Sequence, residues 1–423
     1  MRRREYVIGV VRDVYERHGF EPLETPAFEN IETLLGKYGE EGNKLIFKIL
    51  RRGEHEQTGE ADLALRYDLT VPLARVVAQY QNELPKFFKC YQIQPVWRAD
   101  RPSRGRFREF CQCDIDVIGT TSPLVEVELL ASVSEVLERL GFHDFTIRLN
   151  HRELLAGVLT TAGVAPPLHL DALVAIDKLD KIGRDGVRAE LASRGVAAAS
   201  AGACLELFEL DFPVGIRLRL AADERAVYAI DQLKTIRDLA SNTAAGGRIR
   251  VDPSLARGLS YYTGAIMEVV VADLAGSLGG GGRYDNLIGM FLGRDIPACG
   301  FSLGLERIIV VMTERNMFPS SIVRSALDVM VTIWSHETRE HSLALASELR
   351  GAGLRVDVYP EADKLGKQVK YASSREVPFV AIVGDDERAK GEVGLKDLRS
   401  GEQTAVPRAD AAAFVARRLG SNP

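Results

Sequence analysis

The stretch from Val96 to Gly119 constrains the fold of this chain more than any other segment. It reads VWRADRPSRGRFREFCQCDIDVIG, and a polar loop from Asp100 to Arg106 separates a strand-like run near 87–97 from another that ends at Ile118. This arrangement predicts an antiparallel hairpin whose long tip carries several arginines. Arginines that alternate along a strand point to one face, so we expect Arg98 and its neighbours to line the floor of a site for a flat anion. A solvated hairpin tip is the alternative for the loop arginines.

The rest of the chain divides into segments that differ in composition and in the spacing of their apolar residues. Helical spacing of apolar residues predicts an opening helix that ends at Gly19, and Ala, Leu, Lys, Asp and Glu at helical spacing predict a helical insertion from about 150 to 245. Beyond a linker near 316–325, strands and helices alternate over roughly 95 residues. We therefore expect one α+β domain at 1–320, with an antiparallel sheet and the insertion, and a separate α/β domain at 326–423.

Length and composition set further limits. A chain of 423 residues is too long for one ordinary core, and 46% hydrophobic with 27% charged residues is typical of a globular protein. The net charge of −5 is mild, so it neither favours nor excludes a nucleic-acid partner. Five cysteines fit neither a disulfide framework nor paired CxxC metal spacing, and no apolar stretch approaches the roughly 18 residues of a membrane span. We expect reduced thiols, no membrane association and a cytoplasmic location.

The segment LARGLSYYTGAIME, from Leu255 to Glu268, holds a second candidate site. It places one arginine and two tyrosines among glycines and strand-forming residues, which predicts a short strand with Arg257 where the strand meets a turn. A guanidinium held there suits a phosphate or a carboxylate, because its planar fork gives two parallel hydrogen bonds. Structural alternatives exist for single residues: Arg257 as a surface arginine, Tyr262 as a strand aromatic, Asp68 as a helix cap, and Gly279–Gly282 as a flexible turn.

Several motifs, taken in order, resemble one enzyme family. GFEPLETPAFE with Pro26 is similar to motif 1 of class II aminoacyl-tRNA synthetases, RADRPSRGRFREFCQCDID to motif 2, and GFSLGLER, which ends in Arg307, to motif 3. LARGLSYYTG and GGGGRYDNLIG resemble two segments that are peculiar to the histidyl-tRNA synthetase family. The resemblance runs nearly from end to end, and the last module resembles the anticodon-binding domain that several of these synthetases share.

This resemblance implies a fold, a reaction and partners. The fold would be an α+β catalytic domain of class II type with an antiparallel sheet of about six strands or more, a helical insertion and a C-terminal α/β anticodon-binding domain. The reaction would join L-histidine to tRNA-His through a histidyl-adenylate, with ATP as substrate and Mg²⁺ beside it. Motif 1 would lie at the two-fold interface of a homodimer. Positioning and charge neutralisation should dominate the catalysis, because little covalent work is asked of the protein.

The resemblance also assigns roles in a nucleotide site. By its place in motif 2, Arg98 would bind the α-phosphate and the histidine carboxylate, and Phe110 would stack on adenine. Arg307 would cover the other adenine face, and Arg106 would face the phosphates. Arg257 would place positive charge opposite the attacked phosphorus. Arg257 and Arg98 are therefore the expected catalytic residues, and no metal site built by the protein is expected.

Histidine would be selected by acidic and hydroxyl groups. Asp68, Thr70 and Gln112 match the positions that hold the α-amino group, Asp116 and Tyr262 those that face the imidazole, and Tyr284 completes the pocket. A neutral imidazole has one donor and one acceptor, so a carboxylate and a phenol satisfy both. The expected histidine-binding residues are Asp68, Thr70, Arg98, Gln112, Asp116, Arg257, Tyr261, Tyr262 and Tyr284. Those expected to bind tRNA are Arg101, Arg104, Lys364, Lys367 and Lys370, the lysines recurring three apart on a predicted helix.

This sequence differs from the usual residues of the family at a few positions. The family often has Asp where Ser260 stands, and Glu where Asp68, Asp100 and Asp116 stand; the shorter acids keep the charge, so we expect an effect on affinity rather than on activity.

One alternative function is that of a non-catalytic regulatory paralogue that pairs with ATP phosphoribosyltransferase in histidine biosynthesis, and such a protein should lack the last module. Another class II synthetase should lack RGLSYYTG, and a purely tRNA-binding or stress-sensing relative should have lost the motif arginines.

Overall fold

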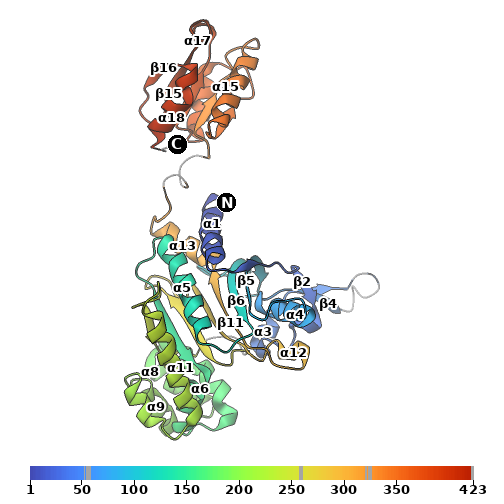
Figure 1. The fold of residues 1–423 in the computed structure, drawn as a ribbon, viewed down its shortest axis with the longest axis vertical. Helices are drawn as coiled ribbons and strands as arrows, with labels where there is room; N and C mark the ends of the chain where they lie inside the picture. Colours follow the sequence, from blue (N-terminus) through green and yellow to red (C-terminus); the bar gives the residue numbers. More distant parts are fainter. Residues whose placement is uncertain (52, 54–58, 257–260, 320–321, 323–325, 421–423) are drawn as a thin grey trace. The chain divides into compact units, whose positions relative to one another are not determined.

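The computed structural model describes residues 1–51, 53, 59–256, 261–319, 322 and 326–420. Two compact units make up the chain, the first of residues 3–317 and the second of the described residues from 318 onward (Figure 1). Each unit has its own sheet and its own hydrophobic core. The candidate residue Arg257 lies outside the described residues, as does Ser260.

A mixed sheet with an antiparallel centre organises the first unit. Its described strands follow the order β1-β5-β6-β11-β10-β9-β7-β8, in which the central six pair antiparallel and the edge strands β1 and β8 pair parallel to their neighbours. The antiparallel sheet is thus confirmed, and the two parallel edge strands were not predicted. The strand bounds are β1 (Glu21–Pro22), β5 (Phe88–Trp97), β6 (Glu109–Ile118), β7 (Thr146–His151), β8 (Ile249–Val251), β9 (Ala265–Val270), β10 (Gly279–Arg283) and β11 (Ala298–Gly304).

The predicted hairpin is the β5–β6 pair, and the structure confirms it. Its register runs from Phe88 opposite Ile118 to Trp97 opposite Glu109. The tip closes in a tight turn in which Ser103 and Arg106 exchange backbone hydrogen bonds of 2.9 and 3.1 Å. Gly105 has a φ of 70°, a conformation that side-chain-bearing residues seldom adopt, so glycine suits this turn. The hairpin therefore carries its arginines on a defined scaffold.

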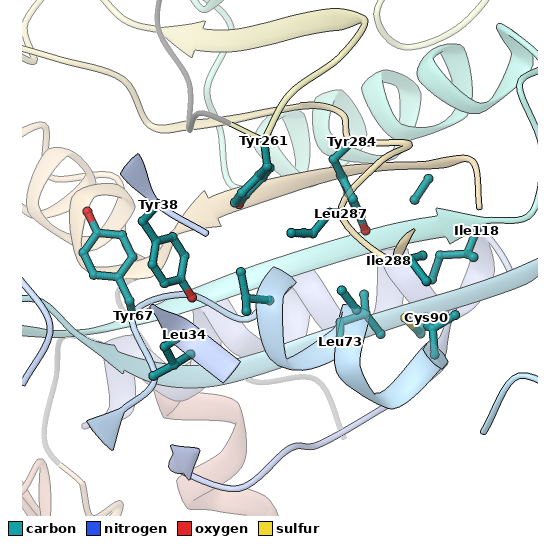
Figure 2. Close-up of a cluster of buried hydrophobic side chains, with 14 of the residues drawn as sticks. Leu34, Tyr38, Tyr67, Leu73, Cys90, Ile118, Tyr261, Tyr284, Leu287 and Ile288 are labelled. Carbon is teal, nitrogen blue, oxygen red and sulfur yellow. The ribbon is translucent and has the colours of Figure 1, made fainter. Parts of the chain in front are cut away.

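A three-stranded sheet and short helices pack beside the hairpin. This sheet has the order β2-β4-β3, and it was not predicted as a unit. Leu34, Leu73, Cys90 and Ile118 form its shared core with the hairpin (Figure 2). Tyrosines belong to the same cluster, so this core continues into polar groups at one side. The elements concerned are β2 (Phe28–Asn30), β3 (Lys48–Leu50), β4 (Ala61–Leu65), α2 (Ile31–Leu34), α3 (Gly39–Lys44), α4 (Thr70–Tyr80) and α12 (Gly289–Leu292).

Amphipathic helices complete the first unit. The opening helix α1 (Arg2–Arg17) buries Val7, Val11, Val14 and Tyr15 at helical spacing, as predicted. Helices α5 (Leu124–Arg139) and α13 (Leu305–Glu314) contact β6. The expected insertion is helical: its elements are α6 (Arg152–Thr161), η2 (Pro166–Leu168), α7 (His169–Ile176), α8 (Leu179–Ser193), α9 (Ala198–Leu207), α10 (Val214–Arg219) and α11 (Glu224–Ala240).

The second unit is a small α/β fold around a sheet of order β13-β12-β14-β15-β16. Val329 and Val331 pack into one core cluster and Met330 into another, because alternate residues of a strand face opposite sides. The expected alternation of strands and helices is confirmed through β14, whereas the antiparallel pair β15–β16 was not predicted. The bounds are β12 (Val329–Val331), α15 (Arg339–Gly351), β13 (Val356–Val358), α16 (Leu365–Ser374), β14 (Phe379–Ile382), α17 (Asp385–Lys390), β15 (Glu392–Asp397), β16 (Gln403–Pro407), η3 (Arg408–Asp410) and α18 (Ala411–Leu419).

One local expectation was wrong. Tyr261 and Tyr262 lie in the loop before β9 rather than on a strand, because the strand begins only at Ala265. The Tyr262 ring instead lies over Gly282, where a Cβ would approach its Cδ1 to 2.9 Å. The alternative of a flexible turn at Gly279–Gly282 is excluded, because these residues begin strand β10. Glycine permits this strand, since side chains there would collide with neighbouring backbone.

Candidate active site

One face of the large sheet combines glycines with polar side chains. Across the strands, Asp114 of β6 stands opposite Ser302 of β11, Ser302 opposite Gly280 of β10, and Gly280 opposite Glu268 of β9. Residues paired in this way point to the same face. The glycine at the centre leaves space that a side chain would fill, so the face is hollow in the middle and charged at its flanks.

The hollow is a cavity of about 360 Å³, and it gathers most of the predicted site residues. The hairpin supplies its arginine side, the glycine strand its floor, the start of α13 one rim, and the loop before β9 another. The volume suits a small ligand or part of a nucleotide. Predicted residues that line it are Asp68, Thr70, Arg98, Arg106, Phe110, Gln112, Asp116, Tyr261, Tyr262, Tyr284 and Arg307.

Three arginines mark one side of the cavity. The Nε of Arg98 donates to the carbonyl oxygen of Tyr67 at 3.0 Å, and its guanidinium lies 4.3 Å from the Tyr67 ring centroid and 5.1 Å from that of Phe110. The carbonyl oxygens of Gly105 and Ser277 accept hydrogen bonds from Arg307 at 3.0 and 2.7 Å. Backbone carbonyls and aromatic rings thus orient two guanidiniums before any ligand binds.

Arg106 is the more exposed of the cavity arginines. Its Nη1 lies 3.6 Å from Oδ1 of Asp100, and about half of its side chain is exposed. An ion pair so open to water stabilises little, so exchanging Asp100 for a phosphate would cost little.

Buried carboxylates form a second charged group in the cavity. Asp68 accepts hydrogen bonds from the hydroxyls of Tyr38 and Tyr261, each at 2.9 Å, and Asp116 accepts one from the hydroxyl of Tyr284 at 2.6 Å. Figure 2 shows these tyrosines entering the cluster from separate segments of the chain. Burial raises the pKa of Asp68 above its usual range and that of Asp116 to about 7. A ligand that brings positive charge would relieve this cost.

Gln112 contacts two polar neighbours that were not among the predicted site residues. Its Nε2 donates to Oγ of Ser302 at 2.7 Å and lies 3.4 Å from Oδ1 of Asp114. With the amide oriented by those contacts, its Oε1 is buried and has no hydrogen-bond partner among the described residues. Burial and the nearby Asp116 raise the pKa of Asp114 well above its usual range. The buried Oε1 of Gln112 is suited to a ligand that donates a hydrogen bond.

Several polar lining residues were absent from the predicted site, among them Asp114, Glu268, Ser302 and Glu306. A signal existed for some of them. Asp114 lies midway between Gln112 and Asp116, and period two places all three on one face. Glu268 is a lone acid inside the apolar run AIMEVV and is only 4% exposed. Glu306 instead anchors the hairpin, since its Oε2 accepts from the Cys111 backbone at 2.8 Å.

The residues expected to bind tRNA lie outside the cavity lining. Arg101 is exposed on the hairpin tip. Arg104 is paired with Glu314, its Nε donating to Oε1 at 3.0 Å, so it would have to leave that partner to contact RNA. The group Lys364, Lys367 and Lys370, called the α16 lysines below, is exposed; Lys364 immediately precedes the helix, and Lys367 pairs with Asp363 at 3.0 Å.

Within the described parts of the chain, no group of three or more His, Cys, Asp or Glu side chains is placed to hold a metal ion. Likewise, none of the described helices is long and apolar enough to cross a membrane.

Models of two known families match this chain over most of its length. One, described as histidyl-tRNA synthetase, matches residues 1–308, and one described as anticodon binding domain matches residues 328–418. The regulatory alternative, which should lack the last module, is therefore not favoured. The matches also confirm the expected fold class.

Individual relatives agree with the family models. A histidine–tRNA ligase of Gloeobacter violaceus is 44% identical, with 100% of this chain and 96% of that protein covered, and one of Porphyromonas gingivalis is 44% identical, with 98% and 96% covered. Among solved structures, histidyl-tRNA synthetase from Nostoc sp. PCC 7120 is 33% identical, with a TM-score of 0.83 and with 98% of this chain and 95% of that chain covered.

Proposed function

Because the chain belongs to the histidyl-tRNA synthetase family, we propose that its cavity joins L-histidine to ATP and that the chain then charges tRNA-His. In the first step the histidine carboxylate would attack the α-phosphorus of ATP, forming histidyl-adenylate and releasing pyrophosphate. In the second, the 3′ end of the tRNA would take the histidyl group and AMP would leave. Residues 1–320 would carry out the chemistry, and residues 326–423 would meet the anticodon.

One observation carries this proposal: a single cavity holds both oriented arginines and buried carboxylates. A triphosphate is strongly anionic, whereas the amino group of histidine is cationic. The two substrates of the activation step therefore match the two kinds of charged group in the cavity. Holding them together in one orientation supplies much of the rate enhancement when the protein does little covalent chemistry.

The arginine side would bind the nucleotide. Arg98 would bridge the α-phosphate and the histidine carboxylate, because its fork can serve two oxygens and its plane is already fixed between Tyr67 and Phe110. Phe110 and Arg307 would enclose the adenine from its two faces, and Arg106 would face the outer phosphates. Arg257, which lies outside the described residues, would place positive charge opposite the attacked phosphorus.

The carboxylate side would select histidine. Asp68, Thr70 and the free acceptor Oε1 of Gln112 would receive the α-amino group. Asp116 and Tyr262 would meet the two imidazole nitrogens, with Tyr284 holding the Asp116 carboxylate. An amino acid that cannot pair with these buried groups would leave them unsatisfied at about 1–3 kcal/mol each.

Mg²⁺ would enter with ATP rather than reside in a protein cage. Hydrated Mg²⁺ on phosphates needs only one or two carboxylates. Glu268 and Glu306 line the cavity and carry the required charge, but Glu306 would have to share its carboxylate with Arg4 and the Cys111 backbone, which it already contacts. The ion would offset phosphate charge, while the arginines orient the reacting groups.

We further propose a cytoplasmic homodimer. Motif 1 precedes and includes β2, where Phe28 is 52% exposed, and Leu50 of the same small sheet is also 52% exposed. Apolar side chains exposed in this way are suited to burial against a second copy across a two-fold axis. Light scattering that finds only monomer at working concentration would contradict this part of the proposal.

Pyrophosphate exchange with ATP tests the function. With each of the twenty amino acids in turn, we expect exchange with histidine alone. Arg98→Met should abolish the exchange, while Arg108→Met, which removes an exposed arginine of the same hairpin outside the cavity lining, should retain it. Exchange with another amino acid, or equal loss in both variants, would overturn the assignment.

A further inference from the structure

Arg148 contacts three segments that are far apart in the sequence. It stands on β7, and its side chain is only 16% exposed. Its Nε donates to Oδ2 of Asp252 at 2.7 Å, and its Nη1 donates to Oδ2 of Asp180 at 2.6 Å and lies 3.6 Å from Oε2 of Glu268. One guanidinium therefore joins the turn after β8, the insertion helix α8 and the cavity wall on β9.

The turn after β8 leads directly into the cavity wall. Oδ1 of Asp252 accepts hydrogen bonds from the backbone and hydroxyl of Ser254 at 2.9 and 2.6 Å, while Oδ2 receives Arg148. The buried Asn150 donates to the carbonyl oxygen of Leu255 at 2.9 Å. Arg148 and Asn150 are two residues apart on β7, so neighbouring side chains of one strand face hold both ends of the turn.

Leu255 separates the cavity from the insertion. On one side it lines the cavity, and on the other it lines a small crevice together with Ile176 at the end of α7 and Asp180 in the first turn of α8. A break at Gly183, where φ is 67°, separates that turn from the rest of α8. A movement of this turn would reach the cavity through packing on Leu255 and through the ion pair with Arg148.

We propose that Arg148 is a positioning residue for histidine activation, which couples the placement of the insertion helices to the cavity wall formed by Leu255 and Glu268. Its contacts give the physical reason: Asp180, Asp252 and Glu268 are all acids that meet at one guanidinium, and without it they would repel one another. Arg148 is not among the described cavity-lining residues, so it acts through these neighbours. The inference rests on the proposed function and adds a residue and a route to it.

The test measures single-turnover formation of histidyl-adenylate, normalised to the folded fraction, together with KM for histidine and ATP. Arg148→Met keeps an unbranched side chain and removes the charge, and we expect the rate to fall on the order of 10- to 100-fold, as small misplacements of reacting groups do. Arg148→Lys should recover part of the rate, because a lysine can meet fewer of the three acids. The matched control is Arg250→Met, which removes the exposed arginine opposite Arg148 on β8 and should change the rate less than about twofold.

Asp180→Asn isolates the contribution of the insertion. We expect it to lower the same rate and to add nothing in the Arg148→Met background, since both changes remove the same ion pair. An unchanged normalised rate for Arg148→Met, even with a lower melting temperature, overturns the positioning role, and an Asp180→Asn variant with the unaltered rate overturns the coupling. If the unaltered chain forms no histidyl-adenylate, the proposed function fails and the inference falls with it, whereas failure in the variants alone leaves the function standing.

Discussion

Asp116→Asn is expected to stabilise the ligand-free chain at pH 8 and to give little or no stabilisation at pH 5. Burial raises the pKa of Asp116 from 3.8 to about 7, against the opposing effect of the hydrogen bond from Tyr284. Between about pH 4 and pH 7 the folded chain therefore keeps a proton that the unfolded chain has lost. The stability of the unaltered chain falls as the pH rises through this window, which is the opposite of the behaviour of a carboxylate in an ion pair.

The size of the effect follows from the same pKa. The pKa of Asp116 is 3.8 in the unfolded chain and about 7 in the folded chain. Ionisation of this carboxyl group therefore lowers the free energy of unfolding by about 4 kcal/mol at pH 8 and by about 1.5 kcal/mol at pH 5. Asparagine carries no such dependence, and the cost of finding partners for its amide, about 1–3 kcal/mol, is the same at both pH values. The gain in unfolding free energy should therefore be about 2–3 kcal/mol larger at pH 8 than at pH 5.

Urea unfolding at the two pH values measures this difference. Asp185→Asn is the matched control, because the Asp185 side chain is 99% exposed and its replacement should give the same small change at both pH values. The same Asp116→Asn variant should raise the KM for histidine about tenfold or more and leave the KM for ATP nearly constant, since the amide can present a donor where the imidazole also donates. A gain that is equal at pH 5 and pH 8 would refute the reasoning from burial.

Three further outcomes are expected. Gly281→Ala should destabilise the first unit by about 3 kcal/mol or more, because its Cβ would collide with the carbonyl oxygen of Gly300. Gly280→Ala, whose Cβ would lie 3.1 Å from the Met267 carbonyl oxygen, should fold and weaken ligand binding. Equal melting temperatures for the two variants would contradict this expectation. Arg257→Ala should slow adenylate formation on the order of 100-fold with little change in substrate binding, as single-turnover kinetics would show. Replacing the α16 lysines by glutamine should flatten the salt dependence of tRNA binding, and an unchanged slope in filter-binding titrations would mean that the anticodon surface lies elsewhere.

The parts of the fold that the sequence predicted have strong local periodicity. The β5–β6 hairpin was readable because two alternating runs flank a polar loop, and α1 because its apolar residues recur at helical spacing. β10 was not readable in this way, because a run of glycines has no side-chain period and usually indicates a turn. Only the neighbouring strands, whose backbones leave no room for Cβ atoms, make it a strand.

The pair β15–β16 was missed for a different reason. In the segment Glu392–Asp397 the apolar residues Val393 and Leu395 alternate with other residue types, so a period of two was present in the sequence. The segment is short, however, and the expected alternation of strands and helices did not include it. The antiparallel partners also depend on the turn at Gly401, whose φ is 80°.

Asp68 illustrates why the role of a single site residue could not be determined from the sequence. Taken as alternatives, a helix cap and a ligand-binding acid each explain an aspartate just before an apolar helix. In the structure one carboxylate does more than the first role requires: Oδ1 accepts the backbone N–H of Val71 at 3.1 Å and the hydroxyl of Tyr38, while Oδ2 accepts the hydroxyl of Tyr261, 193 residues away. The cap fixes the carboxylate at the start of α4, and the two tyrosines orient it toward the cavity. The hydrogen bond at the start of the helix thus also holds the carboxylate in place for ligand binding. From the sequence the two roles look like alternatives, because it does not show that the distant tyrosines contact Asp68.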